Sequence, residues 1–600
     1  MSPRRKAKLP TGQEIVKNMS NITESRICQN CHKEFAITPD DFLFYEKIKV
    51  PPPTFCPECR LIRRLIMRNE RTLYKRKCDL CGEEKILIYP KDSQYKVYCF
   101  DCFHSDKFDG TIYAQDYDFS KTFFEQYEKL FKNVPRLGII KQGFINNSEY
   151  TNRVSDLKNC YLIFASNRNE DCLYGELFWE SKNCMDCYNV HKCEKCFECI
   201  DCYSCNGLKY SKECSECIDS YFMLNCRNCQ NCFGCTNLRN KSYCIFNEQY
   251  EKGAYLERIS ELKITNRNDL ENIKKIVYQK SLENIVPSMV EHHSTNSSGN
   301  WIESSKNVKM SFNCEKVEEG KYSFGIFGSK DIMDYTYWGL SSELIYESCS
   351  IGRQCSAVSF CSESWDQLIK AEYCINCRSS SNLFGCVGLY KKQYCILNKQ
   401  YTKESFDELR TKIIQHMMDF PFTDKVGRIL RYGEYFPCDM LPFAYNETIA
   451  QQFFPKTKEE VIINGYRWKE PDTKNYVATV LSNELPLDIK FVSDNILSEV
   501  ISCAHEGKCN QQCTTAFKIV PNELQFYRVN NIPLPILCPN CRHYERLLKR
   551  QPIRLWHRGC MCEQENHGHV GLCQNEFETS YALDRPETVY CLDCYRKEVV

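Results

Sequence analysis

Cysteine pairs recur at both ends of this 600-residue chain, which contains 43 cysteines in all. From residue 28 the N-terminal end repeats the pattern CxxC four times, with twenty-four, eighteen and seventeen residues between successive pairs. A CxxC turn brings two sulfurs to one metal ion, and a second pair brought alongside by the fold closes a tetrahedral shell of four thiolates. The spacing therefore predicts closed metal sites, with zinc as the expected ion.

Two sites are predicted in the N-terminal copy if neighbouring pairs combine. The first would use Cys28, Cys31, Cys56 and Cys59, and the second Cys78, Cys81, Cys99 and Cys102. An interleaved cross-brace is the open alternative. A closed shell leaves no coordination position for a substrate, so the expected role is to supply folding energy. Iron–sulfur ligation and redox dithiols are the other interpretations of these pairs.

The C-terminal end carries a second copy of the pattern with less regular turns. Gaps of twenty-four and eighteen residues recur, but CxxxC and CxC replace two of the CxxC turns. The predicted ligands are Cys509, Cys513, Cys538, Cys541, Cys560, Cys562, Cys591 and Cys594. Further candidate ligands are His567, His569, Cys573, Cys503 and His505. With two ions in each copy, about four zinc ions are expected per chain.

Residues between the cysteines match at a constant offset of 482, which identifies an internal duplication. Phe35 and Ile37 correspond to Phe517 and Ile519, and "VPPPTFCPECR" corresponds to "IPLPILCPNCR". Both ends should therefore fold as the same zinc-ribbon-like module.

A basic segment joins the second and third cysteine pairs of each copy. In the first copy, leucines at helical spacing lie among arginines, which predicts a basic helix or extended arm between two zinc sites. Clustered arginines suit contact with phosphates, so nucleic acid is the predicted partner. The predicted contact residues are Arg60, Arg63, Arg64, Arg68, Arg71, Lys75, Arg76, Arg546, Lys549, Arg550 and Arg554. The alternative is a helix whose arginines face solvent or pair with acids elsewhere in a chain of net charge +1.

The central cysteines follow a different spacing. They recur at a lag of twenty-one residues, as in Cys172, Cys193, Cys214 and Cys235. A fixed period near twenty residues indicates a solenoid, in which like residues of successive repeats stack. Free thiols are often fully buried, so most of these cysteines are predicted to fill the interior. Runs such as CxxCxxCxxCxxC keep metal ligation open as an alternative, and redox or disulfide chemistry as another.

This central region is itself duplicated. "FGCTNLRNKSYCIFNEQY" recurs 151 residues later as "FGCVGLYKKQYCILNKQY", and a helical pattern that could cap an open edge follows each copy. The second copy has lost most of its cysteines to serine, leucine and aromatic residues, which favours a packing role over metal binding. The polar stretch 292–300 is a predicted hinge between the two copies.

These patterns together predict a mainly β fold with helical caps. Tandem zinc-ribbon-like modules at both ends would flank two duplicated β-helix-like solenoid segments. The expected parts are an N-terminal zinc module at 20–110, a helical connector at 111–145, a first solenoid at 146–250, a helical cap at 251–290, a second solenoid at 300–401, a second cap at 402–430, a linker at 431–500 and a C-terminal zinc module at 501–600.

The composition of the chain and the absence of membrane, signal-peptide and catalytic motifs narrow the classes of function that are expected. No run of eighteen apolar residues occurs and the N-terminus lacks the apolar core of a signal peptide, so no membrane partner and an intracellular, cytoplasmic location are expected. No phosphate-cradling glycine loop, GxSxG motif or HExxH helix is found, so a non-enzymatic protein is expected. A glycoside-cleaving acid pair within the solenoid is the remaining enzymatic hypothesis.

The segments "VPPPTFCPECRLIRRLIMRNERTLYKRKCDLC", "NCYLIFA" and "CPNCRHYERLLKR" resemble those of a family of cysteine-rich, zinc-ribbon-containing proteins of candidate-phylum bacteria and giant viruses. The resemblance covers nearly the whole chain and implies no particular activity; for a viral member it implies a location in the virion. Two functions are therefore expected. One is a zinc-binding, non-enzymatic protein that contacts nucleic acid, and the other is a structural or protein-interaction scaffold within a larger particle, with the solenoid flank as its contact surface.

Overall fold

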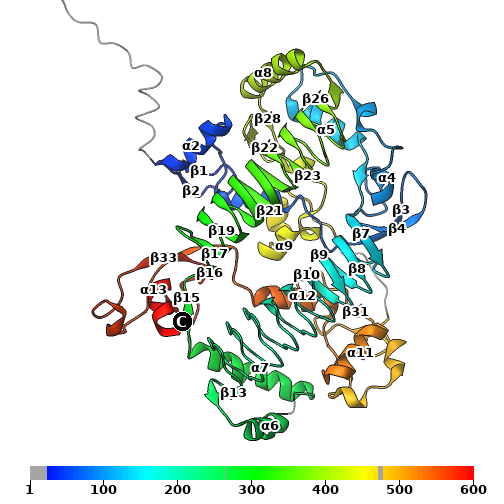
Figure 1. The fold of residues 1–600 in the computed structure, drawn as a ribbon. Coiled ribbons are helices and arrows are strands. Elements are labelled where there is room, and N and C mark those ends of the chain that lie inside the picture. The colour runs from blue at the N-terminus through cyan, green and yellow to red at the C-terminus, as the bar shows by residue number, and fades with distance from the viewer. Residues whose placement is uncertain (1–22, 263, 471–476, 600) are drawn as a thin grey trace, which may run out of the picture.

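Two parallel β-ladders run through the middle of the molecule (Figure 1). Groups of cysteines lie near both ends of the chain. The computed structural model describes residues 23–262, 264–470 and 477–599. The chain is sheet-rich with helices, which agrees with the broad prediction of a mainly β fold with helices.

The first ladder comprises residues 141–245. Its strands are β7 (Lys141–Asn146), β8 (Asn152–Lys158), β9 (Tyr161–Glu170), β10 (Leu173–Trp179), β11 (Tyr188–His191) and β12 (Ile200–Tyr203), which pair in sequence order. Isolated parallel bridges continue the same register as far as Phe233 and Ile245. β13 (Cys244–Ile245) then pairs with β14 (Glu248–Gln249), and the helices α6 (Lys252–Glu261) and α7 (Arg267–Leu282) follow.

The first ladder repeats every twelve residues rather than every twenty-one. Leu173 pairs with Met185, Met185 with Phe197, and Phe197 with Lys209. The predicted period was wrong because the cysteines occupy every third position of the chain, as at Cys193, Cys196, Cys199 and Cys202. Twenty-one is a multiple of three but not of twelve, so that lag reports which positions are buried and not the length of the repeat.

Backbone conformation explains the three-residue pattern. The residue before each buried cysteine has a positive φ, as at Lys195 (53°), Glu198 (47°) and Asp201 (54°). A left-handed residue at every third position bends the strand sharply, so that each following side chain faces the same interior. Small side chains are favoured there, and cysteine combines small size with an apolar surface.

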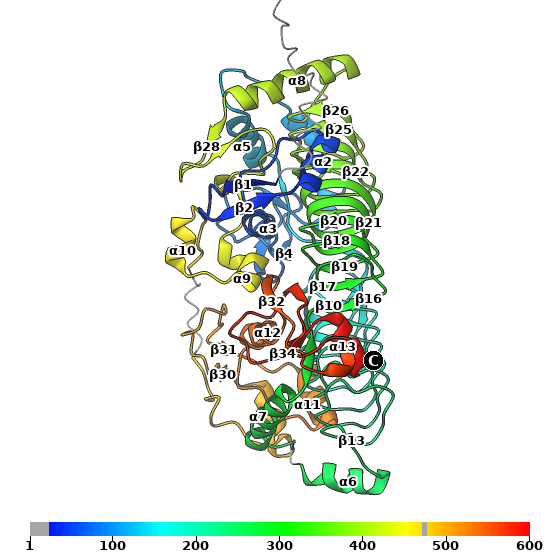
Figure 2. The same cartoon turned by 90° about the vertical axis from the view of Figure 1, so that its left-hand side faces the viewer.

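The second ladder comprises residues 291–396. Its strands are β16 (Glu291–His292), β17 (Gly299–Glu303), β18 (Lys306–Lys309), β19 (Ser311–Glu315), β20 (Glu318–Lys321), β21 (Phe324–Gly352), β22 (Ser356–Ser359), β23 (Ser362–Trp365), β24 (Ile369–Glu372), β25 (Ser381–Phe384) and β26 (Gln393–Ile396), with β27 (Lys399–Gln400) antiparallel at the end. Pairing again uses a twelve-residue offset, as in Phe312 with Phe324, and widens to thirteen where Cys349 meets Ser362. Helix α8 (Lys403–Asp419) follows, and it lies at the opposite end of the molecule from α6 (Figure 2).

Two predicted flexible segments are instead part of the packed structure. The stretch 292–300, expected to be a hinge, belongs to the second ladder, where Gly299 pairs with Ser311. The described residues of the expected linker 431–500 contain helical elements, and Tyr435 and Tyr445 are fully buried. Its elements, with the preceding strands, are β28 (Phe422–Thr423), β29 (Ile429–Leu430), α9 (Ile449–Phe453) and α10 (Lys458–Ile463). Helix α9 contacts a helix of each terminal module, so this segment joins the two modules.

The two modules have the same order of elements. The N-terminal module has β1 (Glu24–Ile27), β2 (Glu34–Ile37), α2 (Pro39–Ile48), α3 (Pro57–Leu65), β3 (Tyr74–Lys77), β4 (Glu84–Leu87), β5 (Val97–Tyr98) and α4 (Phe100–Phe103). The C-terminal module has β30 (Ile501–Ser502), β31 (Ala516–Phe517), α11 (Pro521–Asn530), α12 (Pro539–Leu548), β32 (Trp556–Gly559), β33 (Glu576–Thr579), β34 (Thr588–Tyr590) and α13 (Leu592–Val599). β34 pairs with β15 (Ile285–Pro287), the strand that precedes the second ladder.

One helix of each module packs on the ladder that is farther from that module in the sequence. Helix α3 of the N-terminal module contacts β21 of the second ladder, and α12 of the C-terminal module contacts β10 of the first. The predicted helical connector supports this arrangement, because α5 (Phe123–Asn133) buries Phe123, Phe124 and Tyr127 on one face, and Phe123 lies against Tyr373 and Phe384. It ends at β6 (Arg136–Leu137), which pairs with β5.

Candidate metal centres

Four groups of four cysteines lie at the two ends, with the ligand atoms of each group within 4.8 Å of one another. Their members are Cys28, Cys31, Cys56 and Cys59; Cys78, Cys81, Cys99 and Cys102; Cys503, Cys513, Cys538 and Cys541; and Cys560, Cys573, Cys591 and Cys594. With Zn–S bonds of about 2.3 Å, a tetrahedral site needs sulfurs about 3.8 Å apart. The measured separations include 3.7 Å from Cys31 Sγ to Cys56 Sγ and 3.8 Å from Cys573 Sγ to Cys594 Sγ. These groups could hold metal ions.

One hydrogen bond recurs in all four groups. The backbone N–H of the third cysteine donates to the sulfur of the first, at 3.2 Å in two groups, 3.3 Å in one and 3.1 Å in one. That third cysteine immediately precedes a helix, so it presents its amide from a helix N-terminus. Amide donors of this kind stabilise the negative charge of a thiolate, which is the form that binds a metal.

The structure brings the N-terminal ligands together in the predicted sequential pairing. Both predicted groups are present as named, and neighbouring CxxC pairs combine without interleaving. The C-terminal module differs from the prediction at two positions. Cys503 replaces Cys509 in one group, and Cys573 replaces Cys562 in the other. Cys509 lies beside its group as a fifth thiol, with its sulfur 3.7 Å from that of Cys541.

The shift between the two copies could have identified these ligands. Cys31, Cys56 and Cys59 correspond to Cys513, Cys538 and Cys541 at the offset of 482, but residue 510 at the position of Cys28 is asparagine. The missing ligand is supplied seven residues earlier by Cys503. An insertion within the first CxxC turn therefore changes the spacing without changing the set of four sulfurs.

Most of the central cysteines lie in the interior of the ladders. In the first ladder, Cys193 Sγ donates to the carbonyl oxygens of His191 and Cys202, each at 3.4 Å. The same two-acceptor pattern recurs at Cys184 and Cys199. In the second ladder, burial raises the pKa of Cys314 to about 12 and that of Cys349 to about 11. Buried thiols that donate to backbone carbonyl oxygens fit the predicted role of interior packing.

The arginines predicted to contact phosphate are mostly buried against acidic side chains. Arg60 Nε lies 2.8 Å from Asp334 Oδ2, and Arg64 Nη1 lies 3.0 Å from Asp334 Oδ1, with all three side chains at most 1% exposed. Arg63 pairs with Glu347 and Glu434. Helix α3 is thus a docking helix that bonds the second ladder through its arginines.

The C-terminal helix α12 docks in the same way on the first ladder. Arg542 Nη1 and Arg546 Nη1 lie 2.7 Å and 2.6 Å from the two carboxylate oxygens of buried Asp186. Arg550 lies 3.1 Å from Asp201. The offset of 482 relates Arg60 and Arg64 to Arg542 and Arg546, so the two modules use equivalent arginines.

The remaining predicted phosphate contacts divide into two sets. Arg68 is buried against Glu70, Arg76 is buried against Asp79, and Arg71 stacks on Phe164 with its guanidinium 4.7 Å from the ring centre. Only Lys75, Lys549 and Arg554 of the named residues have exposed side chains. The prediction of phosphate contact is therefore wrong for the buried arginines, because a guanidinium held by an internal carboxylate is not available to a polyanion. These buried arginines instead match the alternative, in which the arginines pair with acidic residues elsewhere in the chain.

A cleft of about 660 Å³ lies between the two ladders. Four of the chain's six tryptophans line it: Trp179 from the first ladder, and Trp301, Trp338 and Trp365 from the second. On one wall Trp179, His191 and Tyr203 succeed each other at the twelve-residue spacing, with ring centres 6.0 and 4.7 Å apart. No sequence pattern predicted this cleft, because its walls come from two separate ladders.

Comparisons with known proteins identify no family for this chain. None of the known protein families and none of the curated proteins compared matches it. One solved structure with limited similarity is that of a putative acetyltransferase from Desulfovibrio desulfuricans G20, with 8% sequence identity and a TM-score of 0.09. The match covers 41% of this chain and 65% of that structure, and at this TM-score it carries no argument about fold or function. Among the described residues, no helix combines the length and apolar character needed to cross a membrane.

Proposed function

We propose that the protein is a zinc-binding, non-enzymatic scaffold, in which two zinc-ribbon-like modules hold two β-solenoids in a fixed arrangement. The observation that carries this proposal is the pair of equivalent docking helices, α3 and α12. Their arginines form internal ion pairs with Asp334 and Asp186. The short register of both ladders, mostly twelve residues and between eleven and thirteen throughout, supports a solenoid, since a nearly constant short offset between parallel strands is the pattern of stacked coils. All 43 cysteines are free of disulfides, which suits a reducing compartment.

The scaffold is favoured over the nucleic-acid function first expected. Binding a polyanion needs accessible cations, and the helices that carry most of the basic residues face inward. Net charge of +1 adds no general attraction for nucleic acid. Nucleic-acid contact through Lys75, Lys549 and Arg554 remains a prediction, as does membership of the zinc-ribbon family that the sequence resembles.

Two measurements test the scaffold together. Metal analysis of protein purified without added zinc should find at least four zinc ions per chain, and affinity capture should recover specific protein partners. Capture should survive charge reversal at Lys75, Lys549 and Arg554. Metal-free native protein would overturn the zinc assignment, and salt-sensitive binding of duplex or single-stranded DNA that depends on those three residues would replace the scaffold with a nucleic-acid function.

The tryptophan-lined cleft supports a second candidate function, the binding of a neutral saccharide. Concave sites lined by aromatic side chains are typical of small-ligand sites, and the apolar faces of such rings can stack on sugar rings. The arginines that line the cleft are already paired; for example, Arg153 lies 2.8 Å from Glu363 and Arg353 lies 3.5 Å from Asp366. A neutral ligand therefore fits better than an anionic one.

Tryptophan fluorescence provides the test of this second function. Cellohexaose, maltohexaose and xylohexaose should each be titrated against the wild type and against Trp338→Ala. Binding of at least one sugar that weakens tenfold or more in Trp338→Ala, but not in Trp556→Ala outside the cleft, is the expected result. No response to any of the three sugars would remove the saccharide function.

A further inference from the structure

The C-terminal module contains an insertion directly beside its last cysteine group. Cys560 follows Cys78 at the offset of 482, but Cys573, Cys591 and Cys594 follow Cys81, Cys99 and Cys102 at an offset of 492. Ten residues have therefore been added between the first and second ligands, which turns a two-residue gap into one of twelve. The enlarged loop carries three additional metal-ligating side chains: Cys562, His567 and His569.

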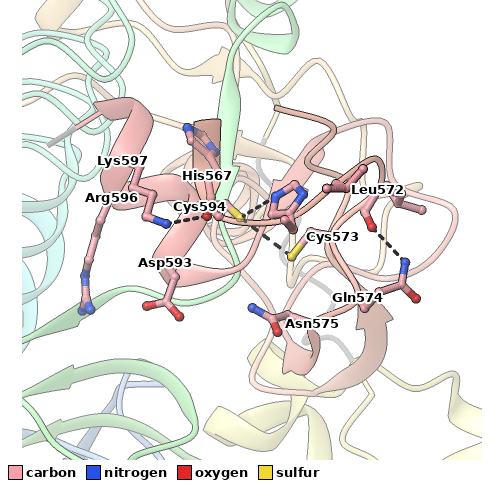
Figure 3. Close-up of a pocket in the computed structure, with 12 residues that line it drawn as sticks. His567, Leu572, Cys573, Gln574, Asn575, Asp593, Cys594, Arg596 and Lys597 are labelled. Carbon is pink, nitrogen blue, oxygen red and sulfur yellow. Dashed lines mark hydrogen bonds between the residues drawn. The ribbon is translucent and has the colours of Figure 1, made fainter. Parts of the chain in front are cut away.

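These three side chains converge on a cysteine that already belongs to the four-sulfur group. Cys562, His567, His569 and Cys594 form a fifth cluster, with ligand atoms within 4.8 Å of one another. The Cys562 sulfur lies 3.2 Å from His567 Nδ1, and the Cys594 sulfur lies 3.5 Å from His569 Nε2. In Figure 3 dashed lines join the Cys594 sulfur to both the Cys573 sulfur and a histidine ring. Cys594 is therefore common to two clusters.

The second nitrogen of each histidine ring has its own partner. His567 Nε2 lies 3.3 Å from Glu598 Oε2, and His569 Nδ1 lies 2.8 Å from the carbonyl oxygen of Gly571. Metal-binding histidines usually donate their other N–H to a carboxylate or a carbonyl, which fixes the tautomer and leaves the ligating nitrogen deprotonated. In both rings the nitrogen that faces the sulfurs is the one left free to bind an ion.

The number of donors matches two ions that share one sulfur. The two clusters together contain seven different side chains: Cys560, Cys562, Cys573, Cys591, Cys594, His567 and His569. Two tetrahedral zinc ions have eight coordination positions, so seven donors suffice only if one thiolate bridges. Cys594 is the one residue that both clusters contain.

We propose that this module holds a dinuclear zinc centre bridged by the Cys594 thiolate. One ion takes Cys560, Cys573, Cys591 and Cys594, and the other takes Cys562, His567, His569 and Cys594. This inference rests on the proposed function, since it assumes that the four-sulfur groups bind zinc. Both ions have closed shells, so the second ion serves to secure the inserted loop against α13 and not to bind a substrate.

The test removes the second ion alone. A His567→Ala/His569→Ala variant should contain one zinc ion fewer than the wild type by inductively coupled plasma mass spectrometry, because the four-sulfur group is untouched. His557→Ala is the matched control, since His557 lies in the same module but contacts only Glu576 and Glu578. An unchanged zinc count in the double variant would overturn the proposal, whereas wild-type protein without zinc would overturn the proposed function itself.

Cadmium NMR decides the case in which the double variant does not fold. Wild-type protein loaded with ¹¹³Cd should show two resonances coupled to each other through the shared sulfur, and His557→Ala should keep them. A Cys562→Ser variant should lose that coupling while retaining one of the two signals. The absence of cadmium–cadmium coupling in the wild type would exclude the bridge.

Discussion

The N-terminal module on the second ladder and the C-terminal module on the first ladder are two versions of one assembly. Their docking contacts agree closely: two arginines one helical turn apart share a single buried aspartate, Asp334 in one case and Asp186 in the other. Their ladder interiors differ, because the first is filled largely by cysteine and the second by a mixture rich in valine, isoleucine and leucine.

The difference shows which features the fold requires in detail. A buried ion pair has strict geometry and loses several kcal/mol when one partner is missing, so its residue types are retained in both halves. An interior position needs only an apolar group of suitable volume, so cysteine and aliphatic residues can replace each other there. The four-cysteine groups are intermediate in how strictly they are retained. Each keeps four sulfur donors, but the spacing of those cysteines along the chain differs between the two modules.

Metal removal should have the largest effect on stability, and it should unfold the two terminal modules while the ladders stay folded. Zinc in small modules contributes about 10–16 kcal/mol of apparent folding free energy, so a strong chelator should unfold both ends. Hydrogen exchange should then become fast in residues 28–102 and 503–594 while the first-ladder interior around Cys193 and Cys202 stays protected. Loss of protection in the ladder at the same chelator concentration would show that its cysteines also bind metal.

Removing the aspartate that two arginines share should have the second-largest effect on stability. Asp334→Ala leaves Arg60 and Arg64 buried without a carboxylate, which should cost about 3–5 kcal/mol in the opening free energy of α3. Asp186→Ala should cost less, because Arg542 retains Glu523 at 3.2 Å.

Hydrogen exchange of α3 and α12 amides measures both variants against one control. Asp331→Ala removes only a partly exposed pair with Lys47 at 3.0 Å, and it should cost less than about 1 kcal/mol. Equal effects of Asp331→Ala and Asp334→Ala would contradict the docking role.

Glu176 should make the C-terminal docking surface sensitive to pH. Burial raises the pKa of this glutamate to about 8, and it faces buried His543 across 3.6 Å, with Glu70 and Arg71 also acting on its charge. Because burial lowers the pKa of His543 well below its usual value, that ring is neutral. In the unfolded chain Glu176 ionises near its ordinary pKa of about 4.3.

The proton bound to Glu176 determines whether stability rises or falls with pH. Between about pH 4 and pH 8 the folded state keeps a proton that the unfolded state has lost, so the wild type loses stability as pH rises through this range. Glu176→Gln cannot titrate and should become progressively more stable than the wild type from pH 5 to pH 9 in thermal unfolding. A constant difference across that range would contradict a raised pKa at Glu176.

Exchanging interior residues between the ladders should have the smallest effect. Cys202→Val in the first ladder and Val358→Cys in the second keep the side chain small and apolar, so each should cost less than about 1.5 kcal/mol. Thermal unfolding measures the cost, and Cys202→Ser is the comparison, because a hydroxyl adds polarity to an apolar interior. Loss of a metal ion in Cys202→Val would overturn the packing role of this thiol.

Several features could be predicted because they depend on residues close together in the sequence. CxxC turns place two sulfurs side by side through local backbone geometry, which is why the N-terminal groups have the predicted members. The apolar stripe of α5 follows from helical periodicity in the same way. The lag of twenty-one misled because local spacing reveals which residues are buried, whereas the repeat length depends on which residues pair between successive strands.

The sequence by itself determined which N-terminal cysteines come together in groups that could hold a metal ion, that both ends are copies of one module, and that the middle is a repetitive β structure. Only the tertiary structure decided the use of the arginines, because their carboxylate partners lie between 274 and 371 residues away, at Asp334, Glu434 and Asp186. It also decided that Cys503 and Cys573 complete the C-terminal groups. Charge and coordination depend on distance in space, and a linear pattern contains that distance only where the chain is locally rigid.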